Sequence, residues 1–206
     1  NKGRNNYTPF GGTKYSNVGS LSELERIEET DRRNAINHRE LEKMQMEAAE
    51  ATKKLELPRD YCIRMAKEKA NAIDVEYDDV LLTADTIVCV GRRILGKPSN
   101  EDQVREFLKI LSGRRHKVIT SVAVKYQDKL LERCVISTVK MKNISNSELD
   151  AYVSLEDWKD KADGYGLQGY AAVFVTWIQG SFSSIIGLPL AETSALLSVA
   201  GIRVLK

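Results

Sequence analysis

Residues 80–90 read VLLTADTIVCV, a nearly continuous apolar run that is rich in β-branched side chains and contains one charged residue, Asp85. Such a run is typical of a buried strand. The residues before it, Pro58–Ile73, carry apolar side chains at helical spacing. Together they predict a sheet with helices packed on it, which is an α/β or α+β fold.

The rest of the chain after this strand alternates helices and strands. The expected elements are a helix from Ser99 to Gly113, strands at His116–Tyr126 and Leu130–Lys142, a helix from Ser145 to Val153, a strand at Ala171–Ile178, a turn region at Gly180–Leu190 and a helix at Ala191–Ala200. The two long strands are expected to form a hairpin. Ser99 is the predicted cap of the first helix, and Ser145 with Glu148 predicts a capping box for the second.

The part of the chain before Pro58 has a different composition. Residues 1–20 contain basic side chains but no acid and read as a basic flexible tail, which is either a solvated terminus or a segment that binds RNA or another acidic surface. Residues 21–56 contain no Gly or Pro and many charges, which predicts a charged helical extension packed on its own domain or on a neighbour. The main domain is expected to start near residue 57.

Composition excludes several classes of protein. The 206 residues carry 31 Lys and Arg against 29 Asp and Glu, so the net charge of +2 argues against a dedicated duplex-binding domain. No apolar run is long enough for a membrane span. Three widely spaced cysteines suggest neither a disulfide framework nor a zinc site, and favour a reducing compartment. The first residue, Asn1, suggests a processed or trimmed chain.

Asp85 is the most unusual residue of the strand at 80–90. Burying a carboxylate costs several kcal/mol unless a cation or hydrogen-bond donors compensate it. We therefore expect a metal ion or a lysine beside it. The alternative is an aspartate at a strand end that caps a turn.

Three further polar residues stand where a plain core would not place them. Lys97 lies in the loop Gly96–Pro98, where its ammonium can reach an anion. Lys69 shares a helical stripe with apolar residues, so its ammonium needs either a partner or a path to solvent. Gln168 lies in a glycine-rich loop at 164–169 that exposes backbone N–H groups.

Two lysines, a carboxylate and an amide loop together describe a site for a polyanion held with Mg²⁺. Asp85 would hold the metal or orient a water for in-line attack at phosphorus, while the lysines neutralise phosphate charge. His38 and His116 have no cysteine or acid at metal-ligand spacing, and we interpret them as solvated or structural.

Several motifs in this chain occur together in one known family. They are Pro58-Arg59-Asp60-Tyr61, Met65 through Ala70, Ala84-Asp85-Thr86, Gly96-Lys97-Pro98, Leu111 through Arg114, Lys161-Ala162 with Gly164 through Gly169, and Gly187-Leu188-Pro189-Leu190. In this order and spacing, residues 57–206 resemble the Maf family of nucleoside triphosphate pyrophosphatases, related in fold to inosine triphosphate pyrophosphatase. The motifs are most similar to the alphaproteobacterial branch that prefers dTTP and UTP.

The resemblance implies hydrolysis of a nucleoside triphosphate to the monophosphate and pyrophosphate with a divalent cation, Mg²⁺ or Mn²⁺. It makes Asp85 the catalytic and metal-binding carboxylate, and Lys69 and Lys97 the phosphate-binding lysines. Gln168 and Thr86 become substrate contacts. It also implies an α/β fold whose mixed β-sheet has flanking helices and a central cleft, and a homodimer, which is common in the family. Family members are described as house-cleaning enzymes for non-standard nucleotides and as inhibitors of septum formation.

The resemblance stops before Pro58. The family begins with a strand and a Ser-x-Ser-Pro-Arg-Arg loop that cradles phosphates, followed by an Asp-Glu pair. This chain has neither, and Glu47 and Glu50 would substitute only if the charged helix crosses the cleft. Asp163 also replaces the small residue that is usual before Gly164.

Two hypotheses follow from the match and its departures. In the first, the chain is an active pyrophosphatase, located in the cytoplasm if it is bacterial. In the second, it is a catalytically impaired Maf-like pseudoenzyme that serves as a structural or assembly subunit of a larger complex. That complex would be held through a protein or RNA partner of residues 1–56, with a mitochondrial ribonucleoprotein as the example.

Overall fold

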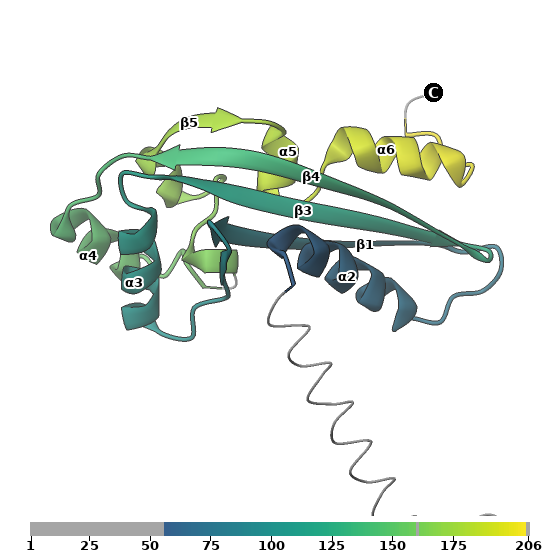
Figure 1. The fold of residues 1–206 in the computed structure, drawn as a ribbon, viewed down its shortest axis with the longest axis horizontal. Coiled ribbons are helices and arrows are strands. Elements are labelled where there is room, and N and C mark those ends of the chain that lie inside the picture. Colours follow the sequence, from purple (N-terminus) through teal and green to yellow (C-terminus); the bar gives the residue numbers. More distant parts are fainter. Residues whose placement is uncertain (1–55, 160, 205–206) are drawn as a thin grey trace, which may run out of the picture. The chain divides into compact units, whose positions relative to one another are not determined.

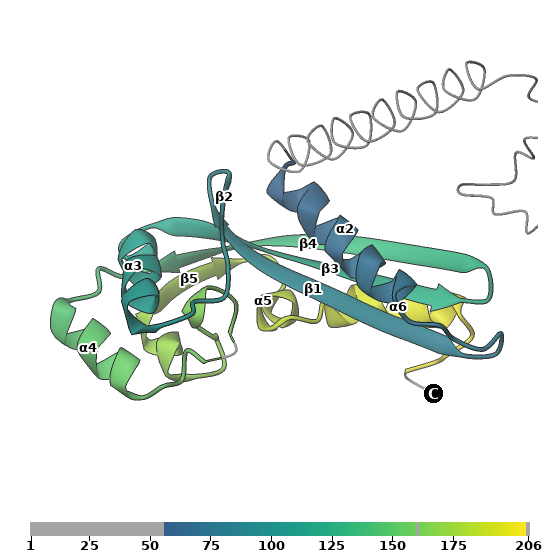
Figure 2. The same ribbon diagram turned by 90° about the horizontal axis from the view of Figure 1, so that it is seen from below.

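The computed structural model describes residues 56–159 and 161–204, and Figures 1 and 2 show them from two perpendicular directions. The predicted basic tail and the charged helical extension up to residue 55 lie outside these residues. In chain order the elements are α2 (Pro58–Asn71), β1 (Val80–Val90), β2 (Arg93–Leu95), α3 (Glu101–Leu111), β3 (Arg115–Tyr126), β4 (Lys129–Met141), α4 (Asn146–Ser154), the 3-10 helices η1 (Ala162–Gly164) and η2 (Tyr170–Phe174), β5 (Val175–Gln179), α5 (Phe182–Ile186) and α6 (Leu190–Val199).

The sheet has five strands in the order β2-β1-β3-β4-β5, and every pairing is antiparallel. β3 and β4 form the predicted hairpin, in register from Arg115 opposite Lys140 to Tyr126 opposite Lys129. β1 pairs with β3 along almost its whole length. The α/β class with flanking helices is therefore confirmed, while the parallel pairing that a mixed sheet implies does not occur among the described residues.

Helix α2 covers one face of the sheet (Figure 1). Pro58 stands in its first turn, where a missing backbone N–H costs nothing. Ala66 and Ala70 are fully buried against Leu81 and Ala123, and these small side chains let the helix lie close to the strands. Because side chains alternate along a strand, the odd-numbered residues of β1 and β3 face α2.

The opposite face is covered by α5 and α6, as both ribbon views show. Leu196 of α6 is buried with Val122 and Val124 of β3. The largest core cluster lies toward the other end of the sheet, where α3 and α4 pack, and it contains Val88 and Val118. The members of these clusters on β1 and β3 are even-numbered, so the even-numbered residues face away from α2.

Helix capping confirms one prediction and corrects another. Ser145 and Glu148 form the predicted capping box of α4. Helix α3 is capped by Asn100, whose side chain accepts the backbone N–H of Gln103, and not by Ser99. Asn100 stands three residues before Gln103, which is the spacing that a side-chain cap needs. Ser99 instead donates to the side-chain oxygen of Gln103.

The strand predicted at Ala171–Ile178 is wrong in its first half, which is the 3-10 helix η2. The chain cannot extend there, because the backbone N–H of Ala172 bonds to the carbonyl oxygen of Gly169 and closes a turn. The turn region predicted at Gly180–Leu190 contains the helix α5, whose cap is Ser181. The C-terminal helix is confirmed as α6. Within the described ranges, no helix combines the length and apolarity that crossing a bilayer requires.

Candidate active site

Strand β1 distributes the predicted site residues over two faces of the sheet. Asp85 is odd-numbered and faces α2, whereas its neighbour Thr86 faces the opposite side. The register places Asp85 opposite Ser121 and Thr86 opposite Thr120 of β3. The two residues therefore lie in different local environments.

On the α2 face, Lys69 reaches Asp85. Its Nζ donates to Asp85 Oδ1 at 2.5 Å and to the carbonyl oxygen of Ala84 at 3.2 Å. The Asp85 side chain is 15% exposed and that of Lys69 is 47% exposed, so the pair lies at the boundary between core and solvent. The expected lysine beside Asp85 is confirmed. The alternative of a turn cap is excluded, because Asp85 lies inside β1.

Cys62 of α2 fixes the backbone beneath this ion pair. Its sulfur lies 3.2 Å from the carbonyl oxygen of Asp85 and 3.4 Å from that of Ile119, so the single thiol hydrogen is shared between these two acceptors. Burial raises the pKa of the Cys62 thiol to about 12, so it acts as a hydrogen-bond donor and not as a nucleophile. All three cysteines are free thiols, in agreement with the sequence.

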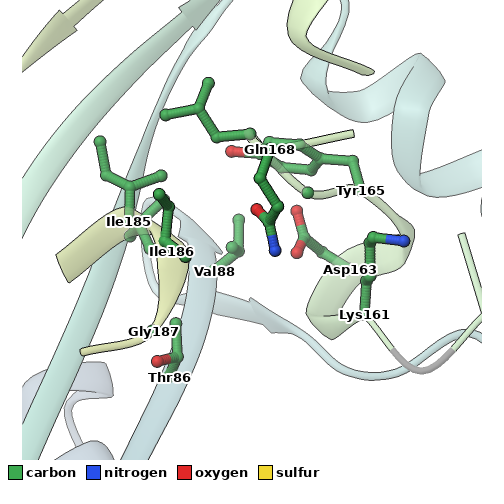
Figure 3. Close-up of a pocket in the computed structure, with 12 residues that line it drawn as sticks. Thr86, Val88, Lys161, Asp163, Tyr165, Gln168, Ile185, Ile186 and Gly187 are labelled. Carbon is green, nitrogen blue, oxygen red and sulfur yellow. The ribbon is translucent and has the colours of Figure 1, made fainter. Parts of the chain in front are cut away.

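On the opposite face, a pocket of about 190 Å³ lies between β1, β3, α5 and the loop that includes η1 (Figure 3). Val88, Val118 and Ile185 form apolar parts of its wall. Thr86 and Gln168, the two residues predicted to contact substrate, both line it. Asp85, Lys69 and Lys97 do not.

A chain of hydroxyl groups determines whether Thr86 can act as a hydrogen-bond donor or as an acceptor toward the pocket. Thr120 Oγ1 donates to the carbonyl oxygen of Ser184 at 2.6 Å. A hydroxyl has only one hydrogen, so Thr86 must donate in the 3.0 Å bond between the two threonines. Thr86 Oγ1 therefore offers the pocket acceptor lone pairs alone.

Asp157 holds the glycine-rich loop that carries Gln168. Its Oδ2 accepts the backbone N–H of Tyr170 at 3.0 Å, and its Oδ1 accepts from Lys161 Nζ at 2.9 Å. Gly169 is required at this point, because a Cβ there would lie 2.3 Å from Asp157 Oδ2. The loop thus has a fixed base and an exposed glutamine at its rim.

His116 and Tyr165 form a buried pair beside the pocket. His116 Nε2 and Tyr165 Oη are 2.6 Å apart, and the histidine is 2% exposed. Burial lowers the pKa of His116 to about 4, so the ring is neutral at neutral pH. The interpretation of His116 as a structural residue is confirmed, whereas His38 lies outside the described residues.

Within the described part of the chain, Lys97 forms no hydrogen bond or ion pair with Asp85 or Lys69, and it does not line the pocket. It is exposed in the loop between β2 and α3. The preceding residue, Gly96, accepts the backbone N–H of Asp163 at 3.0 Å, which fastens the Lys97 loop to the pocket loop. Its role as a phosphate-binding lysine stays a prediction.

The outer edge of β1 is where the two faces meet. β2 pairs with β1 only over Val88–Val90, so within residues 56–159 and 161–204 no strand covers the edge from Val80 to Ile87. Asp85 and Thr86 both lie on this uncovered stretch. In the same ranges, no three His, Cys, Asp or Glu residues are grouped closely enough to hold a metal ion.

Some pocket residues were missed by sequence reasoning. Lys161 and Tyr165 belong to the same motif as Gln168. The sequence predicted that this motif exposes backbone N–H groups, and nothing in its pattern indicated that the side chains of Lys161 and Tyr165 line a pocket. Asp163 was noticed only as a departure from the family. Ile185 and Gly187 carry no chemical signal, and only the fold brings them to Thr86.

The chain matches the family model described as Maf-like protein over residues 30–200. It is 55% identical over 148 residues to the dTTP/UTP pyrophosphatase of Roseobacter denitrificans, covering 72% of this chain and 79% of that protein. It is 53% identical over 152 residues to the dTTP/UTP pyrophosphatase of a Ruegeria species, with 74% and 79% covered. It is 48% identical over 150 residues to the nucleoside triphosphate pyrophosphatase of Anaplasma marginale, with 72% and 76% covered. The chain therefore belongs to the Maf family.

Proposed function

We propose that this chain hydrolyses dTTP or UTP to the nucleoside monophosphate and pyrophosphate. One observation carries the proposal. Asp85 and Thr86 are consecutive residues on the edge of β1 that no strand of the described residues covers, one beside a lysine and the other in a pocket with Gln168. The names of the relatives from Roseobacter and Ruegeria agree with this substrate class.

The charge distribution assigns the two ends of the substrate to the two faces. Lys69 and Lys97 are exposed cations, suited to a triphosphate. The pocket wall has apolar side chains and hydrogen-bonding groups, and the ammonium of Lys161, which also lines it, is paired with Asp157, so the pocket suits a flat base better than a triphosphate. A nucleotide that crosses the uncovered edge of β1 would place its phosphates toward Asp85 and its base toward Thr86 and Gln168.

The reaction needs a water positioned opposite the leaving group. The water oxygen forms a bond to the α-phosphorus and loses one proton to the solvent, the bond from that phosphorus to the bridging oxygen breaks, and the electron pair of this bond leaves with pyrophosphate. Asp85, held in place by Lys69, accepts a hydrogen bond from the water and orients it for in-line attack. Lys69 and Lys97 reduce the negative charge that repels the attacking oxygen.

A divalent cation, Mg²⁺ or Mn²⁺, fits this arrangement as a partner of Asp85. Lys69 bonds to Oδ1 and leaves Oδ2 for a metal. Such ions are commonly held by one or two carboxylates together with substrate phosphates, so a single protein carboxylate is sufficient. The cation would supply charge neutralisation on the phosphates.

The test measures pyrophosphate release from UTP, dTTP and CTP with Mg²⁺ or Mn²⁺. We expect release from UTP or dTTP, and a loss of about 100-fold or more in Asp85→Asn, because the amide neither orients water as a carboxylate does nor binds the cation. Asp128→Asn, in the turn between β3 and β4, removes the same charge away from the site and is the control. It should leave the rate unchanged.

Absence of release from all three nucleotides by the wild-type chain would contradict the proposal and favour the pseudoenzyme hypothesis. Partners would then be sought by co-purification with and without residues 1–56. Equal losses in Asp85→Asn and Asp128→Asn would show that the loss is unrelated to the site. The homodimer, the RNA or protein partner and the cellular location stay predictions, and light scattering after size exclusion tests the first.

A further inference from the structure

One carboxyl group in the pocket wall has no part in the mechanism above. Asp163 lies in η1, is 1% exposed, and its Oδ2 has no hydrogen-bond partner within the described residues. Figure 3 shows its carboxyl group turned into the pocket, on the side of the Gln168 amide. A buried polar atom without a partner destabilises the fold, and a role at a functional site is one reason why a protein keeps such an atom.

The backbone at this position makes the residue more unusual still. Asp163 has φ 55° and ψ 9°, which is the left-handed region. Glycine adopts it most easily, although Asp and Asn tolerate it better than other residues. A carboxyl group is thus present where a residue without a side chain would be less strained and would bury no polar atom.

No cation compensates Asp163 within the described part of the chain. Lys161 lines the same pocket, but its Nζ bonds to Oδ1 of Asp157 and to the carbonyl oxygen of the same residue. Lys97, which follows the Gly96 carbonyl that accepts the Asp163 N–H, is exposed. Burial raises the pKa of the Asp163 carboxyl well above its usual range.

The other titratable groups packed around Asp163 are uncharged at neutral pH. Tyr165 lines the pocket, and its burial raises the pKa of its hydroxyl. Tyr152 of α4, whose hydroxyl donates to the carbonyl oxygen of Gly164, also has a raised pKa because of burial. His116 of β3, which bonds to Tyr165, has its pKa lowered to about 4. These neighbours carry no positive charge, so they do not stabilise the ionised form of the Asp163 carboxyl.

We propose that Asp163 is a specificity-determining residue of this pocket, and that its carboxylic acid group forms two hydrogen bonds with the N3–H and adjacent carbonyl of a uracil or thymine base. The inference rests on the proposed function. A carboxylic acid presents an O–H donor beside a C=O acceptor, which complements the C=O acceptor and N–H donor of the imide edge. A carboxylate has acceptors only, and its charge would repel the triphosphate.

The first test is a binding measurement without metal or turnover. The ligand is a UTP analogue with a methylene group in place of the α,β-bridging oxygen, with its N3-methyl derivative and inorganic triphosphate as comparisons. We expect Asp163→Gly to weaken the binding of the analogue about 3- to 10-fold, the value of one neutral hydrogen bond or somewhat more. Asp163→Asn, which keeps a donor and an acceptor, should bind within about 3-fold of the wild-type chain.

Two comparisons separate base recognition from a structural role. The wild-type chain should prefer the analogue over its N3-methyl derivative, and Asp163→Gly should lose that preference. Inorganic triphosphate should bind all three proteins equally. Equal binding of the analogue by all three, parallel changes with inorganic triphosphate, or no binding of the analogue by the wild-type chain would each overturn the proposal.

The second test reads the protonation of Asp163 directly. The carboxyl carbon of Asp163, assigned by its absence from Asp163→Asn, is followed by ¹³C NMR from pH 5 to 8. We expect a protonated carboxyl at pH 7. A midpoint below pH 7, or tighter binding of Mn²⁺ alone to the wild-type chain than to Asp163→Asn, would make the group a carboxylate at neutral pH and overturn the proposal. Neither test needs hydrolysis, so a chain that binds the analogue but releases no pyrophosphate contradicts the proposed function alone.

Discussion

The polar residues on the two sides of β1 differ in whether other protein groups satisfy them. On the α2 side, the carboxylate of Asp85 has a lysine ammonium at 2.5 Å, and its backbone carbonyl has a thiol donor. On the pocket side, considering the described residues alone, Thr86 keeps unused acceptor lone pairs and one oxygen of Asp163 has no hydrogen-bond partner. On the α2 side the charge of Asp85 has a counter-charge as soon as the protein folds, whereas on the pocket side the polar groups are left for a ligand. Changes on the first side should therefore alter turnover, and changes on the second should alter binding.

The largest effect is expected from removing the ammonium that pairs with Asp85 on the α2 side of β1. Lys69→Met keeps the aliphatic stem and removes the ammonium. We expect kcat for pyrophosphate release to fall roughly 10- to 100-fold, because a charge-assisted contact contributes about 1.5–3 kcal/mol. Lys67→Met is the control, since Lys67 lies on the same helix but pairs with Glu132. Equal losses in the two variants would show that the ion pair with Asp85 has no special role.

The next effect concerns the buried histidine beside the pocket. In the folded chain, burial lowers the pKa of His116 from 6.5 to about 4, so between these values the unfolded chain binds more protons. Stability should therefore fall as the pH drops from 6.5 to 4, by about 2 kcal/mol from this residue. Urea unfolding of the wild-type chain and His116→Gln over this range measures it. An equally steep loss in the variant would contradict the assignment.

A smaller effect is expected on the pocket side itself. Gln168→Ala removes an amide at the rim without disturbing the loop glycines. We expect KM for UTP to rise about 3- to 10-fold while kcat changes little, because one neutral hydrogen bond to the ground state is lost. Gln179→Ala, on β5 and outside the pocket, should leave KM unchanged. A fall in kcat without a change in KM would place Gln168 with Asp85.

The smallest effect should come from loosening the loop that carries Gln168. Asp157→Asn weakens the bonds to Lys161 and to the backbone of Tyr170, but retains an acceptor. We expect a rise in KM of about 2- to 3-fold, because the loop must then be ordered by the ligand. Hydrogen exchange of the Tyr170 amide should become faster in the variant. Unchanged exchange with unchanged KM would show that the loop is held by other contacts.

Local patterns in the sequence predicted most of the architecture. The continuous apolar run at 80–90, the alternation in the hairpin and the Ser145 capping box each depend on neighbours in sequence, and the structure confirms all three. The errors occurred where tertiary contacts override local preference. Val173 and Phe174 have side chains suited to a strand, but the chain enters this segment through a turn that the bond from the Tyr170 N–H to Asp157 holds, and it forms η2.

The candidate site was predicted in its residue types and not in its arrangement. A charge inside a strand predicted a metal ion or a lysine beside Asp85, and the structure shows that the lysine is Lys69, which the sequence did not specify. The division of Asp85 and Thr86 between two faces follows from strand alternation and was available from the sequence. The pocket itself was not, because its walls come from segments that only the packing of α5 and η1 against the sheet brings together.

Because these segments lie far apart in the sequence, the hairpin and the pocket form at different stages of folding. The β3–β4 hairpin consists of local contacts and can form once Met141 has been synthesised. The pocket needs both Thr86 and Gly187, which are roughly a hundred residues apart, so it arises late in vectorial folding. A ligand that binds only the finished pocket shifts this last step by mass action. Nucleotide supply during translation would then influence the yield of native protein as well as its rate of turnover.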